Sequence, residues 1–114
     1  MIGQADLRVI KMMIEKTNRI IEICKLHSRD EIQAEYVLSD ALQYEFEKLY
    51  EDTTRLSIEF RLSNEWLEID KMRGIRNRIA HDYESVILNI LIDTAEINIP
   101  ELNEVLNKIV MENS

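Results

Sequence analysis

The sequence predicts an all-α fold, an antiparallel bundle of four to five helices that forms one domain over residues 1–114. Three observations predict it. Residues that favour helix, chiefly Glu, Leu, Ile, Lys and Arg, dominate the chain. Two glycines and one proline leave little turn chemistry for hairpins. Apolar residues recur every three or four positions, which is the helical period. With 46% hydrophobic and 32% charged residues, the composition is that of a globular protein with one modest core.

The first helix is predicted over about Gln4 to Leu26. Its stripe consists of Leu7, Ile10, Ile14, Thr17, Ile21 and Cys24. Further apolar residues widen this stripe, so we expect the helix to contact two neighbours; these residues are Val9, Met13 and Ile20. The break follows at His27, which we expect at a helix end or in a loop. Ser28 with Glu31 three residues later has the form of a capping box for the next helix.

The second helix is predicted from Asp30, or a few residues later, to about Leu62. Its apolar face is formed by Leu38, Leu42, Phe46, Leu49, Thr53, Leu56 and Phe60. Three tyrosines on this helix are expected to be half-buried packing residues, namely Tyr36, Tyr44 and Tyr50. Three polar residues in its second half are candidates to support a functional site, namely Asp52, Thr53 and Arg55.

A stop and restart at Ser63–Glu65 introduces a third helix. Its buried face consists of Trp66, Ile69, Met72, Ile75 and Ile79. Ser85 can cap a fourth helix, whose apolar residues continue to Ile97. The run Asn98-Ile99-Pro100-Glu101 is typical of a helix start, with Asn as the cap and Pro in the first turn. We therefore expect a fifth helix, with Leu102, Val105, Leu106 and Ile109 on its apolar face.

The net charge of −8 argues against a long groove for nucleic acid. Four cations nevertheless fall within eight residues with no acid among them: Lys71, Arg73, Arg76 and Arg78. An acidic body with one basic spot suits a small site for a phosphodiester. The sequence contains no His/Cys cluster with ligand spacing, and its scattered acids are expected on solvated helix faces. We therefore expect neither a metal nor a cofactor.

Location is suggested by three features of the sequence. The single Cys24 excludes an internal disulfide and fits a reducing compartment. No apolar run is long enough to span a membrane. The first residues lack the basic-then-apolar pattern of a signal peptide. We therefore expect a cytoplasmic protein with no membrane partner.

Phosphate chemistry is concentrated in the stretch Arg76-Asn77-Arg78-Ile79-Ala80-His81-Asp82-Tyr83. A guanidinium can hold a phosphate through two parallel hydrogen bonds, and a histidine can act as general base or acid near neutral pH. Residues five apart on an ideal helix point about 140° apart, so Arg76 and His81 converge only if the helix ends near Ala80. Together they would suffice for metal-free cleavage of RNA through its 2′-hydroxyl. The alternative is structural, with Arg76 bonding helix-end carbonyls or Asp82 and His81 serving as an ordinary helix-terminal residue.

The pattern Arg76-x4-His81-x-Tyr83 resembles the signature of the HepT-like toxins, a family within the HEPN superfamily of small helical ribonucleases and nucleotide-binding proteins. The Arg55-Leu56-Ser57 segment, Trp66 and the Met72-Arg73 pair also resemble that family. Two features depart from the pattern. Asp82 stands where a small residue is common, and it could pair with Arg78 or favour the protonated form of His81. Arg73 offers a second arginine, which leaves open whether it or Arg76 is the functional one.

The resemblance implies an endoribonuclease toxin in which Arg76 and His81 are catalytic and the remaining polar residues of the stretch support them; these are Arg73, Asn77, Arg78 and Asp82. It also implies an RNA substrate such as tRNA, and a homodimer or higher oligomer with motifs facing across a cleft. Its implied partner is a minimal nucleotidyltransferase antitoxin that attaches adenylate to Tyr83. Two rivals remain: a non-catalytic nucleotide-binding helper subunit of a nucleotidyltransferase, and a purely structural helical adaptor.

Overall fold

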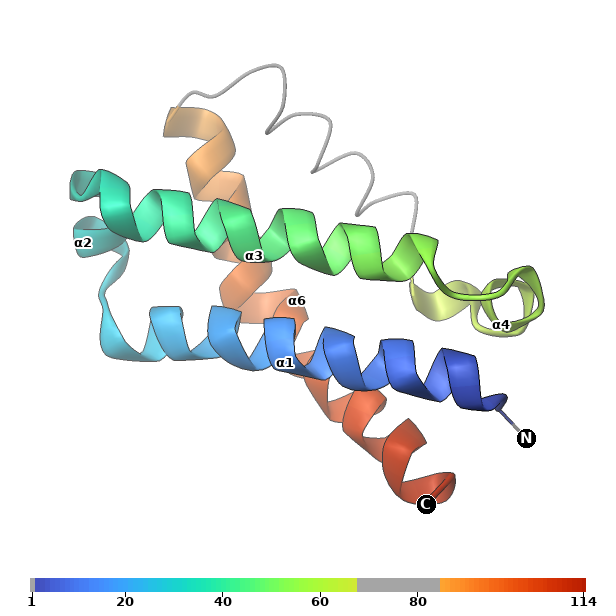
Figure 1. The fold of residues 1–114 in the computed structure, drawn as a ribbon. Coiled ribbons are helices and arrows are strands. Elements are labelled where there is room, and N and C mark those ends of the chain that lie inside the picture. Colours follow the sequence, from blue (N-terminus) through green and yellow to red (C-terminus); the bar gives the residue numbers. More distant parts are fainter. Residues whose placement is uncertain (1, 68–84) are drawn as a thin grey trace.

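The structure is a computed structural model that describes residues 2–67 and 85–114. Every regular element in these two stretches is helical, which confirms the all-α prediction (Figure 1). The elements are α1 Gln4–Leu26, α2 Arg29–Ala34, α3 Tyr36–Thr54, α4 Ile58–Ser63, the 3₁₀ turn η1 Glu65–Leu67, and α6 Ser85–Glu112. Helices α1 and α3 lie side by side and antiparallel, while α6 crosses behind them and packs along α1.

Helix α1 is the centre of the core because it packs against both α3 and α6, as the width of its apolar stripe predicts. Fully buried side chains come from all three helices; the largest are Ile10, Met13, Ile20, Leu42, Leu49, Leu91, Ile92 and Leu106. Burying each such side chain contributes roughly 1.5–3 kcal/mol. Thr17 is the polar member of the α1–α6 contact, donating to the Met13 and Ile14 carbonyls and accepting a 2.8 Å hydrogen bond from Asn103.

The predicted capping box is present at the start of α2. The Ser28 hydroxyl accepts from the Glu31 amide at 3.2 Å, and the Glu31 carboxylate accepts from the Ser28 amide at 3.2 Å. His27, which caps the C-terminal end of α1, also places its Nδ1 3.3 Å from that carboxylate. The Ser28 backbone N–H, assisted by His27, holds the pKa of Glu31 below its ordinary value. This corner therefore fixes how α2 leaves α1.

Substituting Ser28→Ala removes the hydroxyl that satisfies a free amide of the first turn. We expect the free energy of unfolding to fall by about 1 kcal/mol, the usual cost of losing a serine cap. Urea unfolding followed by circular dichroism measures this value. Ser63→Ala is the matched control, since Ser63 is the last residue of α4 and caps none of the helices that the structure describes. An equal loss in both variants would contradict the capping role.

The unbroken second helix predicted from about residue 30 to Leu62 is wrong, because the segment forms three helices. Glu35 is extended and separates α2 from α3. The second corner, at residues 55–57, is held from two sides. Asp6 of α1 accepts from the Ser57 amide at 2.8 Å and from its hydroxyl at 2.6 Å. Arg61 donates to the carbonyl of Thr54 at the end of α3, where intrahelical donors run out, and to the carbonyl of Leu56 within the corner.

Most of the residues predicted on the apolar face are buried despite these breaks, but two of the three tyrosines are exposed. Leu42, Phe46 and Leu49 are buried. Tyr36 and Tyr44 are 75% and 55% exposed, so the expectation of half-buried packing is wrong for both. Tyr50 is partly buried, as predicted.

The predicted boundary between a fourth and a fifth helix is also wrong, because α6 runs unbroken through Pro100. Pro100 lies on the exposed side of α6, so its ring meets solvent rather than another helix. Its neighbour Ile99 and the residues Ala95 and Leu106 are buried. The apolar face of α6 is therefore continuous across Pro100, and its packing outweighs the hydrogen bond that proline cannot donate.

Substituting Pro100→Ala restores an amide donor within α6. Alanine is about 3 kcal/mol more favourable than proline inside a helix, while the greater freedom of the unfolded chain offsets part of that gain. We therefore expect the free energy of unfolding to rise by about 1–2 kcal/mol, measured in urea. Unchanged or lower stability would show that α6 depends on proline at this position.

Cys24 lies partly buried against the core, as its place in the α1 stripe predicts. Burial raises the pKa of its thiol, and Glu96 raises it further. Because only the thiolate reacts, a smaller fraction of Cys24 than of a free thiol is in the reactive form near neutral pH. We expect iodoacetamide to alkylate Cys24 more slowly in the folded protein than in urea, and its rate to rise at a higher pH than that of a free thiol. Equal rates in both states would contradict this.

No helix in the described part of the chain is long and apolar enough to cross a membrane.

Candidate active site

The residues predicted to carry the chemistry lie between 68 and 84, outside the described residues. This holds for the catalytic pair Arg76 and His81, for Tyr83, and for the supporting residues Arg73, Asn77, Arg78 and Asp82. Their roles stay predictions. The structure does describe both ends of this segment and the polar residues of α3 that were candidates to support it.

The chain enters the segment through η1, where the predicted stop and restart at Ser63–Glu65 is confirmed. Asn64 organises this turn, since its side-chain amide donates to the Phe60 carbonyl at 2.8 Å and accepts from the Trp66 indole at 3.0 Å. Leu67 is buried, whereas Trp66 is 42% exposed. Trp66 was predicted on the buried face of a helix; the 3₁₀ turn instead directs the next residue inward.

The chain leaves the segment at α6, which begins at the predicted Ser85. Leu88, Leu91 and Ile92 in its first turns are buried. Leu67 belongs to the same core cluster as these residues. The two ends of the motif segment are therefore anchored in one hydrophobic core, which fixes where it starts and finishes.

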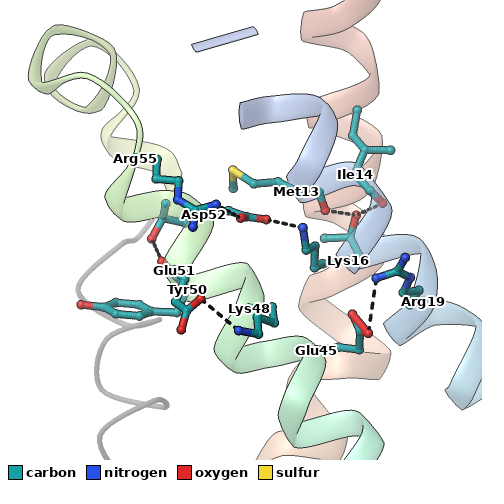
Figure 2. Close-up of polar contacts among 12 residues, drawn as sticks. Met13, Ile14, Lys16, Arg19, Glu45, Lys48, Tyr50, Glu51, Asp52 and Arg55 are labelled. Atoms are coloured by element: carbon teal, nitrogen blue, oxygen red, sulfur yellow. Dashed lines mark hydrogen bonds and ion pairs between the residues drawn. The ribbon is translucent and has the colours of Figure 1, made fainter. Parts of the chain in front are cut away.

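Of the three candidate supporting residues, Asp52 and Thr53 lie on α3 and are engaged by neighbouring groups, while Arg55 directly follows the helix. Asp52 is buried, with Oδ2 3.1 Å from the Lys16 ammonium and Oδ1 3.5 Å from the Arg55 guanidinium (Figure 2). The Thr53 hydroxyl is buried and donates to the Tyr50 carbonyl at 2.6 Å. The Arg55 side chain is 57% exposed. Of the three, only Arg55 remains accessible to a substrate.

A second ion pair links the same two helices. The Arg19 guanidinium lies 3.6 Å from Glu45, whose side chain is nearly buried (Figure 2). Glu45 Oε2 and Asp52 Oδ2 are buried and accept no hydrogen bond from the described residues. The contact between Asp52 Oδ2 and the Lys16 ammonium is therefore an ion pair whose angles do not meet those of a hydrogen bond. The expectation that the acids lie on solvated faces is wrong for Glu45 and Asp52. Two cations of α1 neutralise them instead.

These two ion pairs between α1 and α3 were not predicted from the sequence, because each pair combines residues from both helices. Glu45 and Asp52 lie two helical turns apart on α3, and Lys16 and Arg19 lie one turn apart on α1. Each pair separately resembles an ordinary solvated face. The two pairs can be recognised as complementary only once α1 and α3 are known to be antiparallel neighbours.

Within residues 2–67 and 85–114, no group of His, Cys, Asp and Glu could hold a metal ion.

Comparison with known proteins adds the family. The family model described as Ribonuclease HepT-like matches residues 13–109, which is most of the chain. This protein belongs to the HepT-like ribonuclease family. The matched span of the HepT-like chain covers α1 from Met13, all of α3, the motif segment and most of α6. The predicted resemblance is thereby confirmed at the level of the family. No curated protein and no solved structure matches the chain.

Proposed function

We propose that this HepT-like protein is a metal-independent endoribonuclease, the toxin of a toxin–antitoxin pair, with Arg76 and His81 as its catalytic residues. One observation carries the proposal: the ribonuclease family model matches residues 13–109, a span that includes Arg76 through Tyr83. The motif supplies what that chemistry needs, a guanidinium for a phosphodiester and an imidazole for proton transfer.

In the proposed reaction, His81 removes the proton of a 2′-hydroxyl. The resulting oxygen attacks the adjacent phosphorus while the phosphorus–5′-oxygen bond breaks, and the departing oxygen takes up a proton. Arg76 stabilises the charge on the phosphoryl oxygens. The products are an RNA end with a 2′,3′-cyclic phosphate and one with a free 5′-hydroxyl. Support for this pair comes from Arg73, Asn77, Arg78 and Asp82. DNA lacks the attacking hydroxyl and is not a substrate.

Tyr83 gives the proposed site its control. A partner nucleotidyltransferase transfers adenylate from ATP to the Tyr83 hydroxyl, forming a phosphodiester and releasing pyrophosphate. The modification places bulk and negative charge two residues from His81. It therefore competes with the phosphate of RNA for the cations of the motif. The partner acts as the antitoxin by this route.

We also propose that the active form is a homodimer, because one Arg/His pair is a sparse site for an RNA chain. Exposed apolar residues next to the motif segment support this arrangement. Ile58 and Leu62 lie one turn apart on α4, and Trp66 follows in η1; all three are exposed. Such a cluster is typical of a protein–protein contact.

The experiment that tests the function is RNA cleavage in the presence of a chelator. Total RNA is incubated with the purified protein and EDTA, and the new 3′ ends are analysed by mass spectrometry. We expect cleavage, cyclic phosphate at those ends, and no cleavage of an oligonucleotide whose target nucleotide is 2′-deoxy. A requirement for Mg²⁺, or cleavage of the deoxy substrate, would contradict the mechanism. Nucleotide binding without cleavage would instead favour the helper-subunit alternative.

A further inference from the structure

A groove lies between the C-terminal half of α1 and the N-terminal half of α3. Its volume is about 350 Å³, and its apolar lining comes from Ile23 and Leu26 of α1 and from Ala41 and Tyr44 of α3. Leu26 and Tyr44 each expose more than half of their surface. A folded monomer gains nothing from leaving these side chains in water, and adjoining exposed apolar residues mark interaction sites.

The apolar residues of the groove follow the helical period on both walls. Ala41 and Tyr44 line the groove three residues apart on α3. Val37, four residues before Ala41, lies outside the lining but extends the same stripe along α3, and it is also more than half exposed. Ile23 and Leu26 are one turn apart on α1. Two antiparallel helices with facing apolar stripes form a trough that fits the apolar face of a third helix. Within the described residues, no helix occupies it.

The charges around the groove are unbalanced in favour of acid. Glu22 lines it, Asp40 directly precedes Ala41, and Glu47 lies one turn after Tyr44. None of these three acids has an ion pair in the described part of the chain. Two of the nearby cations are already engaged. Arg19 pairs with Glu45, and Lys48 pairs with Glu51 while lying 5.4 Å from the centre of the Tyr44 ring.

We propose that this groove binds a basic amphipathic helix of a partner protein. Apolar side chains spaced by three and four residues on that helix fill the space over Leu26, Ala41 and Tyr44. Lysines or arginines on its flanks meet Glu22 and Asp40, where each charge lies at the surface and sets orientation more than affinity. Lys25, the other cation on this part of α1, has no ion pair among the described residues and repels a basic helix, but the three unpaired acids outnumber it. The interaction is independent of the ribonuclease chemistry.

The test uses two synthetic peptides of about four helical turns that share leucines at the anchor positions. One carries lysines at the remaining positions and the other carries glutamates. Binding of each fluorescent peptide to the full protein is measured by anisotropy. We expect saturable binding of the lysine peptide, at least about tenfold tighter than that of the glutamate peptide. The double variant Leu26→Ser/Tyr44→Ser weakens it by about tenfold or more, which is about 1.4 kcal/mol.

Ile97→Ser is the matched control, because Ile97 of α6 is 67% exposed and lies outside the groove. Circular dichroism confirms that each variant folds. Equal binding of the two peptides, or an equal loss in Ile97→Ser, would overturn the proposal, since binding would then reflect general stickiness. Sedimentation velocity tests the alternative that a second copy of this chain occupies the groove. If the groove variant turns an oligomeric wild type into a smaller species and the lysine peptide does not bind, a second copy fills the groove.

Discussion

Replacing Arg76 or His81 with alanine is expected to lower the rate of RNA cleavage by roughly 10²- to 10⁴-fold, the range typical of losing a general acid–base or a charge-stabilising group. Arg76→Ala removes the guanidinium that neutralises the phosphoryl oxygens. His81→Ala removes the group that accepts the 2′-hydroxyl proton. Single-turnover cleavage of a fluorescent RNA in EDTA measures both rates. The double variant should be little worse than either single variant, because the two residues act in one step.

The chain supplies matched controls for these substitutions. His27 is the only other histidine, and it pairs with Glu31 at the surface. Arg8 is an exposed arginine of α1. His27→Gln and Arg8→Ala should cleave as fast as the unchanged protein. Arg73→Ala decides which arginine dominates: a loss larger than that of Arg76→Ala would transfer the phosphate-binding role to Arg73. Full activity of His81→Ala would contradict the proposed site.

Substituting Lys16→Met is expected to cost about 3–5 kcal/mol of stability, the range for removing one partner of a buried ion pair. Asp52 is buried, with its side chain only 3% exposed, and Lys16 is 13% exposed. Without the ammonium, the carboxylate keeps, among residues 2–67 and 85–114, only the ion pair with the exposed Arg55 at 3.5 Å. The loss is measured as the change in the free energy of unfolding in urea, with the slope checked for two-state behaviour.

The double variant Lys16→Met/Asp52→Leu separates the pair from the packing around it. Replacing both charges with apolar groups of similar size is often neutral or stabilising, so we expect stability within about 1 kcal/mol of the unchanged protein. Glu51→Gln is the surface control on the same helix, since the Lys48–Glu51 pair is exposed and should cost less than about 1 kcal/mol. A Lys16→Met variant as stable as Glu51→Gln would show that the Lys16–Asp52 ion pair contributes little to the free energy of unfolding.

The elements that were predicted well are those whose signal is local. Helix α1 has the predicted bounds Gln4–Leu26 because one continuous stripe and a capping box at Ser28 define it. The corner between α3 and α4 depends on Asp6, 51 residues away from Ser57, and no local pattern announces it. Pro100 looks like a helix start, yet the buried face on both sides of it keeps α6 whole.

The candidate site divides in the same way. The motif Arg76-x4-His81-x-Tyr83 indicates its chemistry from residue types and spacing alone, and the family match supports that reading at family level. The ion pairs of Lys16 and Arg19 with α3 depend on which helices are neighbours. The exposure of Tyr44 in a groove depends on how α1 and α3 pack side by side. Both follow from packing, which the spacing of one helix does not encode.

The most direct measurement is the intact mass of the protein purified from cells with and without a partner nucleotidyltransferase, followed by RNA cleavage with both samples. We expect added adenylate on a peptide containing Tyr83 when the partner is present, and cleavage by the unmodified protein alone. A Tyr83→Phe variant should stay unmodified and active in both backgrounds. Unmodified, well-folded protein that leaves RNA intact would contradict the account and favour a nucleotide-binding helper subunit.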